Sequence, residues 1–219
     1  MHHRIAAIVA GAMLMGAPIG GAAAQGIPLV PQRPTIGIMA GVNLAKISGD
    51  ETDVLDSRTG FLGGIFVTFH LTNTFGIEPE ALYSQRGASM DAGSGFEATI
   101  KMDYIDIPVL LRYDIPVAGP IRPFFVAGPA FGIKAKCAIS GEGEGVSASV
   151  DCDELNDDPE ASFDPKTFDL SGVVGAGLDF RLGGHTLMVG ARYQHGFSDV
   201  VKDASAKSRT WSVVAGLGF

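Results

Sequence analysis

The stretch that decides the fold is the last one of the chain, Trp211-Ser-Val-Val-Ala-Gly-Leu-Gly-Phe219. Successive side chains of an extended strand point to opposite faces. One face is apolar and the other is small or polar, with Val214 as the exception; the apolar face carries Trp211, Val213, Ala215, Leu217 and Phe219. Two structures fit this pattern. One is the closing strand of a barrel in lipid, which offers no hydrogen-bond partner to an open strand edge. The other is a half-buried C-terminal strand of a soluble sheet.

The N-terminus predicts export. Arg4 precedes an apolar stretch at residues 5–15, and small residues at 22–24 offer a cleavage site. This order is typical of a secretory signal peptide, which we place at residues 1–24. The alternative is an uncleaved helical anchor, but Pro18 would interrupt its helix.

Composition favours a barrel over a soluble globule. Glycine accounts for 30 of the 219 residues, about twice its ordinary usage of roughly 7%. Mean hydropathy is positive at +0.25, yet the apolar residues alternate with polar ones and do not form long runs. The net charge is −8 and the basic residues are scattered, so we expect no nucleic-acid partner.

The mature chain divides into eight extended segments, which we place at 34–46, 59–70, 74–86, 99–114, 121–136, 167–181, 185–196 and 208–219. Each reaches the roughly 9–11 residues that a tilted strand needs to cross a membrane. Short connections alternate with long polar ones, which lie at 47–58, 87–98, 137–166 and 197–207. Short turns inside and long loops outside are typical of transmembrane barrels.

The predicted fold is therefore all-β: an eight-stranded antiparallel up-and-down transmembrane β-barrel with four longer extracellular loops. The barrel would cover residues 34–219, and residues 25–33 would form an N-terminal periplasmic extension. The fifth segment fits least well, because it carries apolar residues on both of its faces.

Charged residues share the strand faces that point away from the apolar sets: Glu78, Glu80, Arg86, Asp106, Arg112, Asp169, Asp179 and Arg192. An arginine facing lipid near the bilayer midplane costs about 2–4 kcal/mol, so these side chains should point into the lumen. Eight strands leave an interior just wide enough for side chains to fill. We therefore expect a structural network of arginine–carboxylate pairs. The alternative is an ion pathway or a catalytic pair of carboxylates.

Four runs carry a family resemblance: IEPEALYSQRG (77–87), YIDIPVLLRY (104–113), PFFVAGPAFG (123–132) and FDLSGVVGAGLDF (168–180). With these runs the chain resembles the outer-membrane β-barrel domain of the PorT-like or "porin family" group. The resemblance implies an eight-stranded barrel of the OmpA or OmpX type in the bacterial outer membrane. It implies little about activity. The family pattern also carries prolines inside strands, so we keep the strands at Pro79, Pro108 and Pro129 and expect bulges there.

Cys137 and Cys152 both fall in the longest predicted loop. Exported proteins meet an oxidising environment, and closing a loop of about 16 residues contributes roughly 3 kcal/mol in the chain-entropy model. We predict a disulfide. The alternative is two free thiols or a pair of soft-metal ligands.

The same loop is strongly acidic, with Glu142, Glu144, Asp151, Asp153, Glu154, Asp157, Asp158, Glu160 and Asp164. The ordered spacing of a calcium-binding loop is absent. We predict a solvated loop and no metal or cofactor, while divalent cations that link these carboxylates to lipopolysaccharide phosphates remain an alternative.

An enzyme is not expected. Some eight-stranded barrels modify lipid A with a His and a Ser near the membrane surface, and here His195 and Ser198 lie at the end of the seventh segment. Their spacing departs from the His-x-Ser-Asn pattern of the deacylase family, and no paired acid is evident. The other rival class, a lipocalin-like soluble binder, would bury its apolar face inside and would not need an aromatic C-terminus.

The sequence thus predicts an integral outer-membrane barrel with a structural, adhesive or envelope-complex role, and not an open diffusion pore. Alternatives are an accessory component of a secretion or assembly system, or a lipid A-modifying enzyme. Expected partners are outer-membrane lipid and lipopolysaccharide, and the barrel-assembly machinery, which would dock on Trp211 and Phe219. We expect a monomer.

Overall fold

The chain forms a closed antiparallel barrel in the computed structural model, which describes residues 33–49, 56–91, 97–143, 146–152, 167–199 and 206–219. Its strands are β1 (Thr35–Gly49), β2 (Asp56–His70), β3 (Phe75–Asp91), β4 (Glu97–Asp114), β5 (Ile121–Gly143), β6 (Val146–Asp151), β7 (Phe168–Leu182), β8 (His185–Asp199) and β9 (Ala206–Gly218). Each barrel strand pairs with its chain neighbour, β5 pairs with β7, and β9 closes on β1. Within these ranges, no helix is long and apolar enough to cross a membrane.

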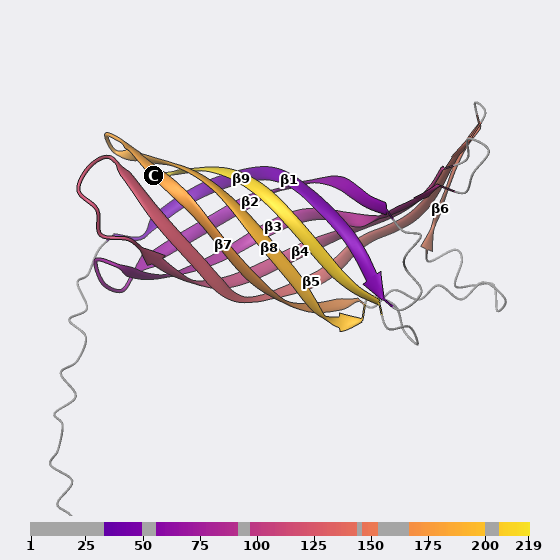
Figure 1. Cartoon of the computed structure of the whole chain (residues 1–219), viewed down its shortest axis with the longest axis horizontal. Coiled ribbons are helices and arrows are strands. Elements are labelled where there is room, and N and C mark those ends of the chain that lie inside the picture. The colour runs from indigo at the N-terminus through magenta and orange to yellow at the C-terminus, as the bar shows by residue number, and fades with distance from the viewer. Residues whose placement is uncertain (1–32, 50–55, 92–96, 144–145, 153–166, 200–205) are drawn as a thin grey trace, which may run out of the picture.

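Eight of the nine strands form the barrel, which confirms the predicted fold. The ninth, β6, pairs with the far end of β5 and lies beyond one end of the barrel (Figure 1). The C-terminus lies at the opposite end, where the short connections are also found (Figure 1). Short turns mark the periplasmic side of such barrels, so β6 lies on the extracellular side.

The apolar face of each strand points outward. Ile38, Leu111 and Val213 are all more than half exposed, as side chains that face lipid must be. The fifth segment, now β5, has apolar residues on both faces because one face meets lipid and the other packs inside the lumen. Phe125 is exposed outside the barrel, whereas Phe124 is buried in the lumen.

Val214, the exception in the closing strand, is also explained by lumen packing. It is buried in an apolar cluster that includes Met39, Leu62, Phe66 and Met188. In β5 and β9, the residues that break the alternation are therefore apolar side chains that pack inside the barrel.

The strands run farther on the extracellular side than the sequence predicts. β3 and β4 remain paired out to Asp91 and Glu97, and β5 continues to Gly143 before β6 turns back along it. These ends mix small, polar and single apolar residues and have no continuous apolar face, so the sequence predicts them as parts of the loops 87–98 and 137–166. Most of the acidic loop, the predicted signal peptide and residues 25–32 lie outside the described residues.

The expected bulges at the prolines are wrong. Pairing between β3 and β4 lapses after Pro79 and resumes at Leu82 in the same register. Pairing between β4 and β5 likewise keeps one register across Pro108. A proline removes one donor from the ladder, and here the neighbouring pairs hold the strands in line. Among the described pairs, the register shift between β4 and β5 falls between Asp103 and Tyr104, outside the apolar band.

The purified protein should be heat-modifiable. A closed ladder offers no free edge from which unfolding can begin, so the barrel should survive detergent until it is heated. Unboiled and boiled samples are expected to migrate differently on a denaturing gel. Identical mobility, together with recovery in the soluble periplasmic fraction, would contradict the transmembrane barrel.

Candidate functional site: the filled lumen

The first charged group in the lumen, counted from the periplasmic end, is built around Arg112 of β4. Its Nη1 lies 3.0 Å from Glu78 Oε2, and its Nε lies 3.0 Å from Asp114 Oδ1. Its Nη2 also contacts Asp179 of β7. The ring of Phe124 stacks under the guanidinium, with 3.9 Å between Cζ and the ring centroid. One buried arginine thus joins three carboxylates from three strands.

Arg192 of β8 extends this group toward the middle of the barrel. Its Nη1 lies 2.7 Å from Glu80 Oε2, and its Nη2 lies 3.7 Å from Glu78 Oε1. Glu78 and Glu80 are both buried on the inner face of β3. Glu78 therefore links Arg112 to Arg192, and the two arginines form one network with the four carboxylates around them.

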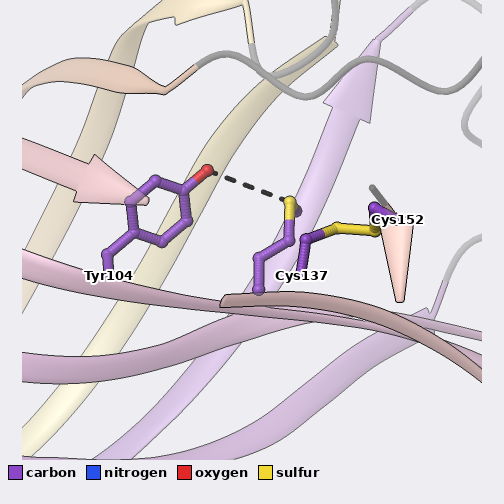
Figure 2. Close-up of a disulfide and its surroundings, with 4 residues drawn as sticks. Tyr104, Cys137 and Cys152 are labelled. Carbon is purple, nitrogen blue, oxygen red and sulfur yellow. Dashed lines mark hydrogen bonds between the residues drawn. A yellow bond between two sulfur atoms is a disulfide. The ribbon is translucent and has the colours of Figure 1, made fainter. Parts of the chain in front are cut away.

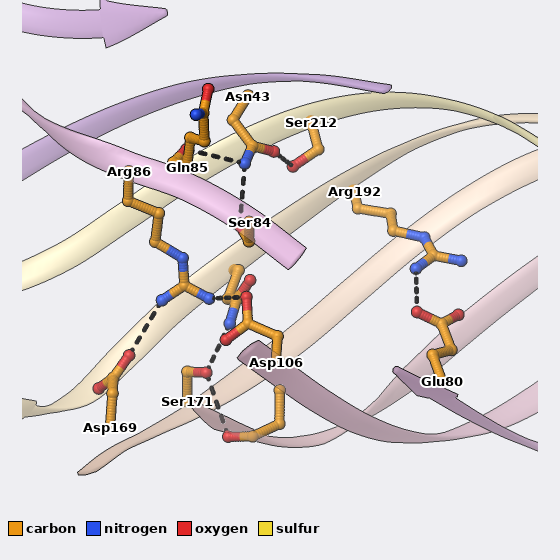
Figure 3. A network of polar contacts seen from close by, with 12 residues as sticks. Asn43, Glu80, Ser84, Gln85, Arg86, Asp106, Asp169, Ser171, Arg192 and Ser212 are labelled. Carbon is orange, nitrogen blue, oxygen red and sulfur yellow. Dashed lines mark hydrogen bonds and ion pairs between the residues drawn. The ribbon is translucent and has the colours of Figure 1, made fainter. Parts of the chain in front are cut away.

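A second charged group lies nearer the extracellular end. Arg86 of β3 donates to Asp169 of β7, with 3.1 Å between Nη1 and Oδ2, and it also contacts Asp106 of β4. Figure 3 shows Arg86 between these two carboxylates, apart from the Arg192–Glu80 pair. The structure thus brings all eight predicted lumenal residues inside the barrel, in two groups.

The sequence analysis missed an uncharged polar chain beside Arg86. Asn43 Nδ2 donates to Ser84 Oγ at 3.0 Å, and Ser212 Oγ donates to Asn43 Oδ1 at 2.7 Å. Figure 3 shows the three residues bridging β1, β3 and β9. All three lie on the inner faces of their strands, so parity could have identified them. The lumenal residues were predicted from their charge, and these three residues carry none.

A disulfide-bonded cluster lies at the extracellular end. The predicted disulfide between Cys137 and Cys152 is confirmed, and it packs with Met102 and Tyr104 in a buried apolar group (Figure 2). The Tyr104 ring lies 5.0 Å from Arg86 Cζ. The cluster therefore sits directly over the Arg86 group.

Little space remains between these layers. The cavity between the Arg192 and Arg86 groups measures about 20 Å³, which is room for roughly one water molecule. A larger cavity of about 230 Å³ opens at the periplasmic end, over Arg112 and Asp179. The larger of these two cavities is therefore at the periplasmic mouth, and side chains leave little room at the one above it.

Buried carboxylates outnumber buried guanidinium groups among the described lumenal residues. Three buried arginines, Arg86, Arg112 and Arg192, face five buried carboxylates, Glu78, Glu80, Asp106, Asp114 and Asp169, and the partly buried Asp179. No group of three or more His, Cys, Asp or Glu side chains in the described chain is arranged to hold a metal ion. Each arginine is thus the shared partner of several acids, and losing one would leave more than one carboxylate without its cation.

The residues considered for catalysis lie outside this lumen network. His195 Nδ1 lies 3.4 Å from the Tyr193 hydroxyl, and the Ser198 hydroxyl accepts a hydrogen bond from the Leu170 amide at 3.0 Å. A nucleophile of this kind needs its serine and histidine within hydrogen-bond reach of each other, and here each is bonded to a different group. This geometry does not favour a Ser–His nucleophile.

The two predicted assembly residues lie on the outer surface. Trp211 is exposed on the lipid-facing side of β9. Phe219 is also exposed, and its ring packs edge-to-face against His185 at 5.3 Å. Phe219 N donates to Ile36 O at 2.8 Å, so the last residue is tied to the first barrel strand.

Residues 23–202 match the family model described as the outer membrane protein beta-barrel domain. The chain belongs to this family. It is an outer-membrane β-barrel protein, and its place is the bacterial outer membrane. No curated protein matches the chain significantly.

Several solved barrels are similar to the chain. The attachment invasion locus protein Ail of Yersinia pestis is 18% identical with a TM-score of 0.46, covering 86% of this chain and 100% of its own. Neisserial surface protein A is 16% identical with a TM-score of 0.49, covering 86% and 100%. The outer membrane enzyme PagL is 13% identical with a TM-score of 0.41, covering 82% and 97%. Because these sequence identities and TM-scores are low, the activity has to be argued from the residues of this chain.

Replacing Arg112 with alanine should destabilise the barrel strongly. The change leaves Glu78, Asp114 and Asp179 without their shared cation, and breaking a buried ion pair costs about 3–5 kcal/mol. Urea unfolding in phospholipid vesicles measures the loss. The matched control is Arg181→Ala, which removes an exposed arginine at the periplasmic mouth and should change stability by less than about 1 kcal/mol. Equal effects of the two variants would refute a structural role for the network.

Proposed function

We propose that this protein is a structural and adhesive barrel of the outer membrane and not an open diffusion pore. The observation that carries the proposal is the filled lumen. Two arginine–carboxylate groups, the apolar side chains packed among them and a disulfide cluster occupy it. Barrels with wide aqueous channels use about 16–18 strands, so eight strands with these large side chains leave no comparable passage.

The extracellular end supports the adhesive part of the proposal. The β5–β6 hairpin extends the barrel wall outward, and Cys137–Cys152 ties its two strands together. A rigid extension loses less conformational entropy on contact with a partner than a flexible loop does. A surface held in this way is suited to contacts with host molecules or with other envelope components.

A second candidate role is that of an accessory component of a secretion or assembly complex. The observation in its favour is the periplasmic cavity, whose rim carries Arg33, Arg122 and Arg181. A basic rim suits an acidic periplasmic partner. Co-purification from membranes, compared with an Arg122→Gln/Arg181→Gln variant, tests this role.

A third role, a lipid A-modifying enzyme, makes a distinct prediction. Such an enzyme would change the mass of lipid A in cells that express it, and His195→Ala would abolish the change. Mass spectrometry of extracted lipid A distinguishes this role from the structural one.

Reconstituted protein should not conduct as an open pore. We expect planar bilayers containing the folded barrel to show no stable, ohmic conductance on the nanosiemens scale, because side chains fill the lumen. As a control, the conductance of the oxidised protein is compared with that of the reduced protein, because reduction of Cys137–Cys152 loosens the extracellular cluster. Long-lived steps of that size from the oxidised protein would overturn the proposal.

We further propose that the protein works as a monomer among lipid and lipopolysaccharide, and that the barrel-assembly machinery recognises Trp211 and Phe219 during insertion. The exposure of both aromatic side chains on the closing strand supports this recognition.

Changing Phe219 to aspartate should lower the amount of protein in the outer membrane. The substitution puts a charge at the end of the closing strand, where the aromatic ring would be recognised. We expect reduced outer-membrane abundance and more periplasmic degradation, measured by fractionation and immunoblotting. Phe197→Asp, a change of the same kind at an exposed phenylalanine of β8, serves as the control. Unchanged abundance of the Phe219 variant would refute an assembly role.

A further inference from the structure

On β1 and β9 the apolar band of the outer surface ends in one rung, which Tyr193 continues on β8; on β8 the exposed Phe197 lies farther out. Leu44 lies opposite Trp211, and Trp211 lies opposite Tyr193. The two aromatic rings are in contact, with 4.8 Å between their centroids. Trp211 is 60% exposed. Aromatic side chains of this kind mark the boundary between the hydrocarbon layer and the headgroups.

The next outward-facing rung, one step toward the extracellular side, is basic. Lys46 lies opposite Arg209, and Arg209 lies opposite His195. Consecutive residues on one face of a strand are about 6.8 Å apart along the strand, so this rung sits at headgroup height. We call Lys46, Arg209 and His195 the basic rung.

Without a bound anion, the basic rung destabilises the barrel. Directly opposed residues have their Cβ atoms about 4.5–5.5 Å apart, and like charges in such a pair repel each other. Lys46 and Arg209 are both exposed. Within the described part of the chain, neither forms an ion pair with a carboxylate. An anion from outside the chain would turn this repulsion into attraction.

β2, β3 and β4 differ from β1 and β9 at the corresponding positions, and on β7 the exposed Leu170 and Phe168 continue the apolar face. The outward residue that follows the apolar band is Thr59 on β2, Gln85 on β3 and Asp103 on β4. Lys136 of β5 is exposed as well, but it lies opposite Asp103. Among these described positions, opposed cations without an acid therefore occur on β1 and β9.

We propose that the basic rung binds the phosphate groups of a lipid A molecule in the outer leaflet. The inference rests on the proposal that lipopolysaccharide surrounds the barrel, and it assigns the contact to one site. Arg209 can donate to a phosphate with two parallel N–H groups, and Lys46 adds a compact charge. The acyl chains of the same molecule lie against Leu44 and Trp211. Free phosphate would use only the basic rung, whereas a lipid uses both rungs at once.

Trp211 is the single tryptophan of the chain, and it lies within the proposed site. Its fluorescence therefore reports which lipid occupies this position. The folded barrel is placed in phosphatidylethanolamine vesicles that contain a small fraction of lipid A with brominated acyl chains, which quench tryptophan on contact. The reference sample carries the same bromine content on phosphatidylethanolamine. A second reference uses brominated lipid A from which the phosphates have been removed.

We expect lipid A to quench Trp211 with an apparent association constant about tenfold higher than that of phosphatidylethanolamine, since each basic side chain near an anionic surface adds to binding. The dephosphorylated form should lose most of this preference. Inorganic phosphate added to millimolar levels should displace brominated lipid A only weakly, because it makes no contact with the apolar rung.

The test variant is Lys46→Gln/Arg209→Gln, which should fall to the level of phosphatidylethanolamine while remaining heat-modifiable. The charge-conserving variant Lys46→Arg/Arg209→Lys should keep most of the preference. Lys136→Gln, the matched control on the other side of the barrel, should behave as the unchanged protein does.

Three results would overturn the site, and they separate the possible failures. Quenching by brominated phosphatidylethanolamine with no preference for lipid A would overturn the lipid A site and leave the barrel in its bilayer. Absence of quenching by either lipid would show that Trp211 does not face lipid, which would overturn the proposed lipid partner as well. An equal loss of preference in Lys136→Gln would mean a general charge effect and would also overturn the site.

Discussion

The constraint on which this structure depends is that a membrane supplies no hydrogen-bond partner to the backbone. The first and last strands must therefore pair, and β1 and β9 do so from Gly37–Gly218 to Gly49–Ala206. Closure fixes which face of every strand meets lipid and which meets the lumen. Burial, charge placement and the position of the boundary aromatic residues all follow from that single division.

Closure also makes the lumen a small, enclosed space for charge. Six carboxylates share three arginines there, and charges buried without a partner are costly. Each arginine pairs with two or three acids, and the acids of Arg86 and Arg112 lie on different strands. Arg112 joins β4 to β3 and β7, and Arg192 joins β8 to β3. The network thus cross-links strands that are far apart in sequence and leaves little room for solute.

Much of the fold could be predicted from the sequence. When one face of a strand meets lipid, apolar residues recur at every second position, and this pattern is easily recognised. The inner position of charges such as Glu80 and Arg192 followed from the same parity. Their pairing did not, because contacts across the lumen depend on register and tilt. The apolar lumen residues Phe124 and Val214 broke the pattern, since a lumen accepts both polar and apolar side chains. The strand β6 alternates apolar and polar residues, but it was missed because its six residues are fewer than the roughly 9–11 that a membrane-spanning strand needs.

The two ends of the barrel are built differently, and this asymmetry bears on function. At the periplasmic end a basic rim surrounds a cavity of about 230 Å³, while the extracellular end carries the Cys137–Cys152 cluster and is extended by β6. The disulfide stiffens this outer end, and opposed cations lie where the apolar band stops on β1 and β9. Both features support the proposed contacts with the outer leaflet and with molecules beyond it.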